Sequence, residues 1–131
     1  MKRLSVLLVC MSMLLPLAAV AQKEQKGAHI VFETTEYDFG EVQRKGGNRS
    51  CTFRFVNDGT EPLVILSAIT SCSCLKVDFS RKPVAVGERG EIRLILESKK
   101  MDEGVFNRVV QIRSNSNDGT KIITIKGVSK D

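Results

Sequence analysis

Short runs of alternating apolar and polar residues, separated by turn residues, constrain the fold of this chain more than any other feature. The clearest run covers residues 49–57, where one side of an extended chain carries Cys51, Phe53 and Phe55. Side chains alternate between two faces along a strand, so a period of two indicates a half-buried strand. The turn residues Asn57-Asp58-Gly59-Thr60 follow at once and end the run.

The same kind of pattern recurs along the chain. Further strands are expected at 29–32, 37–42, 63–69, 75–79, 91–97, 106–114 and 121–128. The run 63–69 is almost wholly apolar, which is typical of a strand buried on both faces. Turns come about every ten residues, and no segment has the period of a helix. These about seven to eight strands predict an all-β fold, an antiparallel β-sandwich of immunoglobulin type.

The first 21 residues are expected to lie outside this domain. Lys2 and Arg3 precede an apolar run, and the segment closes on Ala19-Val20-Ala21. A charged head, an apolar middle and small residues at the exit are typical of a cleaved secretory signal. The run is shorter than the about 20 residues of a membrane-spanning helix, so we expect no transmembrane segment after cleavage.

Cleavage between Ala21 and Gln22 would leave 110 residues, in the periplasm or outside the cell. Residues 22–27 are polar and charged, and we expect residues 22–28 to form a flexible lead-in. Residues 29–131 have the size of one domain. Cys10 raises the alternative of a signal that ends in a lipidated cysteine. Because the apolar run continues beyond Cys10, we expect ordinary cleavage instead.

The distribution of charge argues against nucleic acid as a partner. Removing Lys2 and Arg3 leaves 18 basic and 15 acidic residues, a net charge of +3, with the two signs interspersed along the chain. A nucleic-acid surface would instead gather basic residues with aromatic ones that stack on bases.

Residues suited to catalysis are scarce. His29 is the single histidine, and its position beside the lead-in predicts a strand-edge or surface residue. A Ser/His/Asp or Cys/His hydrolase would need a pocket that brings His29 to a carboxylate and a nucleophile. No glycine-rich phosphate loop precedes a helix, and no cofactor is expected. We therefore predict that the protein is not an enzyme.

The segment Ser71-Cys72-Ser73-Cys74 holds the chemistry that the sequence leaves open. With Cys51, three cysteines remain after cleavage, so at most one internal disulfide can form. Exported proteins keep disulfides. A bridge from Cys51 to Cys72 or Cys74 would close a loop of about 20 residues and stabilise the fold by roughly 3 kcal/mol. Cys51 and the segment 71–74 would come together if residues 57–62 form a hairpin turn between two consecutive strands.

Three other interpretations of Cys72 and Cys74 remain. On one face of a strand both thiols could bind a soft metal such as Cu(I), with only Cys51, His29 and Met101 available to complete the site. A bond between the two would require a bent chain and would be easily reduced, which suits a redox switch. Each cysteine could also be a buried thiol that packs as a small apolar residue.

Five segments, in their order along the chain, resemble a known bacterial family. They are YDFGEV (37–42), FRFVNDGTEPLVI (53–65), SCSC (71–74), PVAVGERGEI (83–92) and IRSNSND (112–118). The set resembles domain of unknown function 1573 (DUF1573), which is similar to the immunoglobulin-like ASPM/SPD-2/Hydin modules. The resemblance covers about residues 32–127 and implies that fold in a bacterial protein. Family members usually carry Cys-Gly-Cys where this chain has Ser73 between its cysteines.

These observations predict an exported, non-enzymatic binding or structural module of the bacterial cell envelope. Its partner would be another envelope protein or a polymer, recognised by loops at one end of the sandwich or by an open edge strand. The candidate loops are 44–49, 81–90 and 114–120. The alternative is a thiol redox or copper-handling protein that acts through Cys72 and Cys74.

Overall fold

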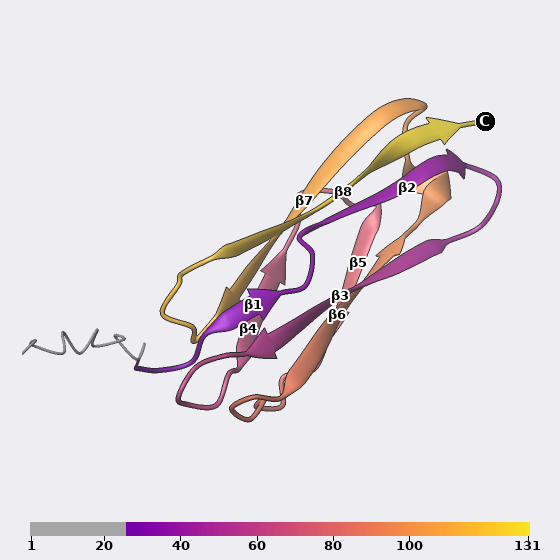
Figure 1. The fold of residues 1–131 in the computed structure, drawn as a ribbon. Helices are drawn as coiled ribbons and strands as arrows, with labels where there is room; N and C mark the ends of the chain where they lie inside the picture. Colours follow the sequence, from indigo (N-terminus) through magenta and orange to yellow (C-terminus); the bar gives the residue numbers. More distant parts are fainter. Residues whose placement is uncertain (1–25) are drawn as a thin grey trace, which may run out of the picture.

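Two four-stranded sheets face each other in the computed structural model, which describes residues 26–131 (Figure 1). One sheet has the order β1 (Ile30–Phe32), β3 (Arg49–Asn57), β6 (Arg89–Leu96), β5 (Leu75–Phe79). The other has the order β2 (Glu36–Gln43), β8 (Lys121–Lys130), β7 (Gly104–Ser114), β4 (Ile65–Ile69). The helical structure in this part of the chain is one 3₁₀ turn, η1 (Ser98–Lys100). The predicted all-β sandwich is confirmed, whereas the expected signal segment lies outside the described residues.

Strand β3 follows the predicted alternation. Cys51, Phe53 and Phe55 are buried between the sheets. They belong to one apolar core to which every strand contributes, and its members from β6, β7 and β8 are Ile92, Leu94, Leu96, Phe106, Val110, Ile112, Ile123 and Ile125. Burying each large apolar side chain stabilises the fold by about 1.5–3 kcal/mol, so this core holds the two sheets together.

The pairing of β2 departs from the predicted antiparallel arrangement. β2 runs parallel to β8, from Glu36 opposite Thr124 to Gln43 opposite Lys130. The chain leaves the first sheet after β1 and enters the second at β2 without reversing its direction (Figure 1). Strand β1 is antiparallel to β3, and β2 keeps the direction of β1. Since β8 also runs opposite to β3, β2 and β8 are parallel.

Strand β4 corrects two further predictions. The run 63–69 does not form a strand buried on both faces, because β4 is an edge strand with Leu66 52% and Ile69 48% exposed. Segment 57–62 is not a hairpin either, since β3 and β4 belong to different sheets. The run looks uniformly apolar because its outward residues are apolar as well as its inward ones, Leu63 and Ile65.

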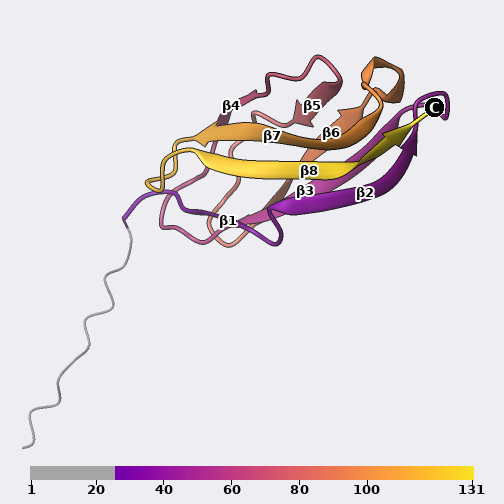
Figure 2. The same ribbon diagram turned by 90° about the horizontal axis from the view of Figure 1, so that it is seen from above.

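Apart from segment 33–35, where the chain changes sheets, the connecting segments gather at two opposite ends of the sandwich (Figure 2). The loop end consists of segments 57–64, 80–88 and 115–120. The disulfide end consists of segments 44–48, 70–74 and 97–103. These two names are kept below.

The domain begins earlier than the predicted boundary at residue 29. Ala28 is buried at the loop end, and its carbonyl accepts a hydrogen bond from Asn117 N–H at 3.1 Å. The carbonyl of Gly27 accepts one from Thr60 N–H at 2.8 Å. Residues 27 and 28, assigned to the lead-in from their composition, are therefore tied to the sandwich.

Candidate functional site

The cysteines pair in one of the ways that the sequence left open. A disulfide joins Cys72 to Cys74, with their Cα atoms 5.1 Å apart, and Cys51 is the free thiol among the described cysteines. A bridge from Cys51 does not form because the expected hairpin is absent. Cys51 instead lies beside Leu94 of β6, and that strand separates β3 from β5.

A tight turn brings the two paired cysteines together. Leu75 N–H donates to Cys72 O at 3.2 Å, and Cys74 N–H lies 3.3 Å from Cys72 Sγ. Within residues 26–131 only glycines have a positive φ, so the turn needs no left-handed residue at Ser73. Serine is therefore compatible with the backbone here, although the family that the sequence resembles usually has glycine between the cysteines.

The two sulfur-bearing residues differ in their exposure. Cys74 is 1% exposed and belongs to the core, and its carbonyl accepts a 2.7 Å hydrogen bond from Glu97 N–H. Cys72 is half-buried and packs against the edge of the same core. The disulfide thus joins a buried residue to one that solvent reaches.

A surface cavity of about 460 Å³ opens beside Cys72 at the disulfide end. The strand β4 stops at Ile69, opposite Gln111, so within the described chain the earlier part of β7 is uncovered on that side. Arg108 lies in this uncovered part, at a core-facing position between buried Phe106 and Val110, and it lines the cavity. Arg108 and the disulfide residue Cys72 therefore line the same cavity.

Of the three ionic residues that line the cavity, Lys100, Asp102 and Arg108, only Lys100 is in an ion pair with another described residue. Lys100 Nζ lies 2.8 Å from Glu97 Oε2, and Lys76 Nζ lies 3.2 Å from Glu97 Oε1. These hydrogen bonds, that from Lys100 first, lower the pKa of Glu97 below its ordinary value. Arg108 Nη1 donates to the neighbouring Asn107 carbonyl at 3.1 Å, and Arg108 takes part in none of the ion pairs of the described residues.

Cys51 has a different character from the paired cysteines. Burial in the core raises its pKa to about 11, so the thiol is neutral at physiological pH. The thiolate is the reactive form of cysteine, and a buried neutral thiol behaves as a small apolar residue.

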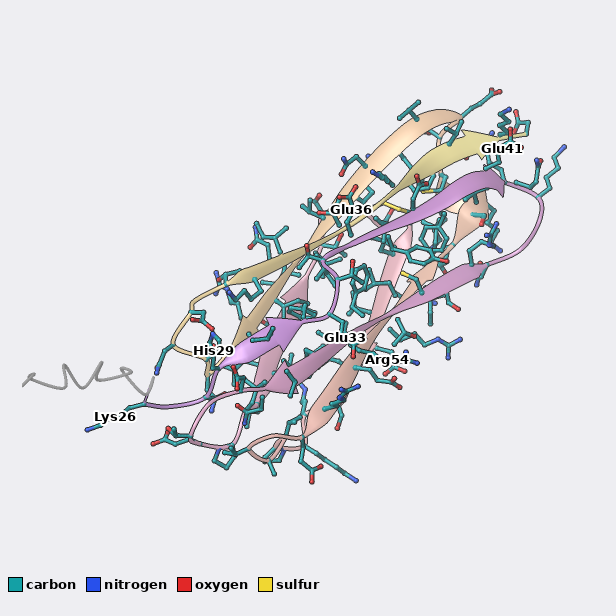
Figure 3. The ribbon with its side chains drawn as sticks, in the orientation of Figure 1. Lys26, His29, Glu33, Glu36, Glu41 and Arg54 are labelled. Carbon is teal, nitrogen blue, oxygen red and sulfur yellow. A yellow bond between two sulfur atoms is a disulfide. The ribbon has the colours of Figure 1, made fainter. Side chains whose placement is uncertain are left out.

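His29 lies at the loop end, beside β1 (Figure 3). Its Nε2 is 2.8 Å from Asp118 Oδ2, and Ser116 Oγ donates to the same carboxylate oxygen at 3.1 Å. In a hydrolytic triad the histidine stands between the carboxylate and the nucleophile. Here the Asp118 carboxylate lies between His29 and Ser116. These contacts join the β7–β8 turn to the start of β1, and Ser116 Oγ donates to Asp118 instead of to a histidine.

The other potential ligands of Cys72 and Cys74 are divided between the two ends. Met101 is buried and lines the cavity beside Cys72, whereas His29 lies at the loop end. Among residues 26–131, no three His, Cys, Asp or Glu side chains are grouped so that they could hold a metal ion. In the same range no helix has the length and apolar character needed to cross a membrane.

The three candidate loops do not form one surface. Loops 81–90 and 114–120 lie together at the loop end, and loop 44–49 lies at the disulfide end. Asn57, which the sequence indicated only as a turn residue, organises the loop end. Its Nδ2 donates to the carbonyls of Glu61 and Val84 at 2.7 and 3.0 Å, and its Oδ1 accepts from Gly59 N–H at 3.0 Å.

Sequence reasoning also missed an exposed apolar surface along β4, which we call the β4 patch. It consists of Leu66, Ile69, Val109 and Ile122, all of them exposed. Ile69 and Ile122 flank Gln111 in register on the outer face of the sheet. A parity count along β7 and β8 would have placed Val109 and Ile122 on that face, but only the structure makes β4 their neighbour.

Comparison with solved structures supports an immunoglobulin-like fold. A protein of unknown function from Porphyromonas gingivalis W83 is 18% identical, with a TM-score of 0.71 over 82% of this chain and 50% of that one. The present chain therefore spans about half of that protein. The ASH/PapD-like domain 7 of human CEP192 is 9% identical, with a TM-score of 0.59 over 78% and 85% of the two chains.

A third similar structure is the periplasmic chaperone SfaE, which is 9% identical, with a TM-score of 0.53 over 77% of this chain and 57% of that one. At such low identities these likenesses show the fold alone. No curated protein matches the sequence significantly. A family profile described as "Protein of unknown function (DUF1573)" matches residues 30–129, which confirms the resemblance seen in the sequence. The chain therefore belongs to the DUF1573 family.

Proposed function

We propose that this chain is an exported, non-enzymatic module of the bacterial cell envelope that binds another protein through its edge strand β4. The partner would add an extended segment to the sheet, main chain against main chain, with apolar side chains over the β4 patch. The observation that carries the proposal is the chemical character of β4 compared with the other edges of the two sheets.

An open sheet edge can pair with a strand of another chain, and proteins usually prevent this by placing charged residues on the edge strand or by keeping it short. Strand β2 has exposed Glu36, Asp38 and Glu41, and β5 has exposed Lys76 and Asp78. Strand β1 has only three residues. Strand β4, with the sequence ILSAI, has five residues and none of them is charged. It is therefore the edge best suited to accept a partner strand.

One group of this edge is already occupied within the chain. Arg81 Nη1 donates to the carbonyl of Leu66 at 3.0 Å, and the guanidinium lies over the Phe79 ring at 5.4 Å. An incoming strand would displace Arg81, whose exposed hydrogen bond is easily replaced by water. Arg81 would thus cover the edge until a partner arrives.

Two further observations support the proposal. The segment before residue 22 has the pattern of an export signal. A fold shared with a periplasmic chaperone, whose name implies action on other proteins, favours a protein partner over a small molecule. For the active-site chemistry of a hydrolase, the order of His29, Asp118 and Ser116 offers no support.

Site-specific photo-crosslinking in the native host tests the proposal. A photoreactive residue at Ile69 should crosslink to one defined protein. Leu66→Lys should abolish that product, because a charged side chain on the edge strand disfavours pairing with another strand. Val31→Lys is the matched control, since Val31 is an exposed apolar residue on the edge strand β1 of the other sheet. It should leave the crosslink intact.

A second measurement identifies the mode of binding. With the purified partner bound, amide hydrogen exchange should slow in 65–69 more than in β1, β2 or β5. Crosslinks only between copies of this chain, or equal loss with both lysine variants, would contradict the proposal. A polymer partner would give no protein crosslink from Ile69 and would contradict it too.

A further inference from the structure

We propose that Cys72 and Cys74 form a reversible thiol–disulfide exchange site that reacts, through Cys72, with the cysteine thiols of a peptide or protein. Arg108 is its positioning residue. This inference goes beyond binding at β4 and does not depend on it, because it rests on other residues at the disulfide end.

The position of the disulfide argues against a purely structural role. The chain-entropy gain from a disulfide falls as the closed loop shortens, and this bond spans a single intervening residue. The turn is also held without it, by Leu75 N–H on the Cys72 carbonyl and by Glu97 N–H on the Cys74 carbonyl. Opening the bond should therefore leave the fold in place.

The difference in burial determines which sulfur reacts. Cys74 is 1% exposed, whereas half-buried Cys72 borders the cavity. An incoming thiolate would attack Cys72 Sγ and form a mixed disulfide as the Cys72–Cys74 bond breaks. The electron pair of that bond leaves on Cys74, which takes up the proton lost by the incoming thiol. Cys74 then packs in the core as a neutral thiol.

A second thiol of the partner completes the exchange. It loses its proton to solvent and attacks, as a thiolate, the partner's sulfur in the mixed disulfide, and Cys72 leaves as a thiolate. The partner is oxidised to a disulfide by two electrons, and the Cys72–Cys74 pair is reduced by the same two electrons. The reverse sequence would reduce a partner disulfide, so no other oxidant or reductant is required for either direction.

The surroundings of Cys72 suit a thiolate on its sulfur. Cys74 N–H lies 3.3 Å from Cys72 Sγ and can donate to it. Arg108 lines the same cavity at a core-facing position and has no carboxylate partner in the described chain, whereas Lys100 is paired with Glu97. Asp102 also lines the cavity and opposes this effect. A nearby cation favours the thiolate, which is the nucleophile in exchange.

The third cysteine plays no part in this exchange. Cys51 is buried, and its strand is separated from β5 by β6. The three cysteines of residues 26–131 are thus accounted for by one reactive pair and one core residue.

Redox titration with peptide mapping tests the site. The purified protein would be equilibrated in glutathione buffers of graded ratio, and free thiols then trapped by alkylation. Cys72 and Cys74 should gain the label together, in a two-electron transition, while Cys51 stays unlabelled in the folded protein. Circular dichroism should be unchanged by reduction. A pair that stays oxidised at every ratio, or that opens only as the protein unfolds, would overturn the proposal.

The contribution of Arg108 needs its own variants. In the reduced protein, Arg108→Gln should lower the rate constant for Cys72 alkylation several-fold, and Arg108→Lys should restore much of it. Arg113→Gln is the matched control, because Arg113 is an exposed arginine on the same strand and lies opposite Ser67 instead of lining the cavity. If Arg108→Gln behaves like Arg113→Gln, the positioning role assigned to Arg108 is wrong.

Discussion

Gly90 of β6 lies directly against the ring of Phe55 on β3. The two residues are opposite each other in register, and a Cβ built on Gly90 would lie 2.4 Å from Phe55 Cζ. Such an overlap cannot be relieved without moving the ring within a filled core. We predict that Gly90→Ala lowers the free energy of unfolding by about 1–3 kcal/mol, as measured by urea denaturation.

A second substitution tests whether this contact is the cause. Phe55→Leu removes the ring, so Gly90→Ala should cost less in the Phe55→Leu background than in the wild type. Additive effects of the two changes would show that the cost of Gly90→Ala has another origin, because residues that touch are expected to couple.

Two fully buried serines should respond in opposite ways to replacement by alanine. Ser98 Oγ donates to the Gly47 carbonyl at 2.7 Å, whereas Ser129 Oγ has no hydrogen-bond partner in the described part of the chain. An unpaired buried hydroxyl costs free energy, and a paired one contributes about 1 kcal/mol. Ser129→Ala should therefore leave the thermal midpoint equal or higher, and Ser98→Ala should lower it. Destabilisation of similar size in both variants would contradict this account.

Some elements of this fold follow from local sequence, and β3 is the clearest. Its inward residues Cys51, Phe53 and Phe55 are apolar and most of its outward residues are polar, so period two is visible directly. Strand β4 lacks that contrast, because exposed Leu66 and Ile69 are as apolar as buried Ile65. Local pattern then cannot separate an edge strand from a strand buried on both faces.

The disulfide and the cavity depend on long-range geometry that the sequence does not display. The sequence is compatible with several cysteine pairings. A bridge from Cys51 is excluded only because segment 57–62 crosses from one sheet to the other instead of forming a hairpin. Arg108 appears as one charge among many in the sequence. It becomes part of a site only because β4 ends at Ile69 and leaves that part of β7 uncovered.

Glu97 should make stability depend on pH in the acid range. Its folded-state pKa is lowered by the hydrogen bonds of Lys100 and then of Lys76, so the stabilisation is present above the ordinary value of 4.5 and is lost as pH falls below it. Urea denaturation of Glu97→Gln should show lower stability at neutral pH and a flatter decline below pH 4.5. Glu91→Gln, exposed on β6, is the control and should keep the wild-type decline.

Cys51 should contribute a pH dependence of the opposite sense. Burial raises the pKa of its thiol from the ordinary value of 9.0 to about 11, so the unfolded chain loses this proton before the folded one does. The unfolded state is then favoured progressively as pH rises from 9.0 to about 11, with an upper limit of about 2–3 kcal/mol.

The experiment compares wild type with Cys51→Val, a change of similar size that removes the titrating group. All other groups of the chain are common to both proteins, so their contributions cancel in the difference. The difference in unfolding free energy between Cys51→Val and wild type should be constant below the ordinary pKa of 9.0 and should shift in favour of the variant above it. A difference that stays constant over the whole range would mean that the Cys51 thiol ionises as easily in the core as in water.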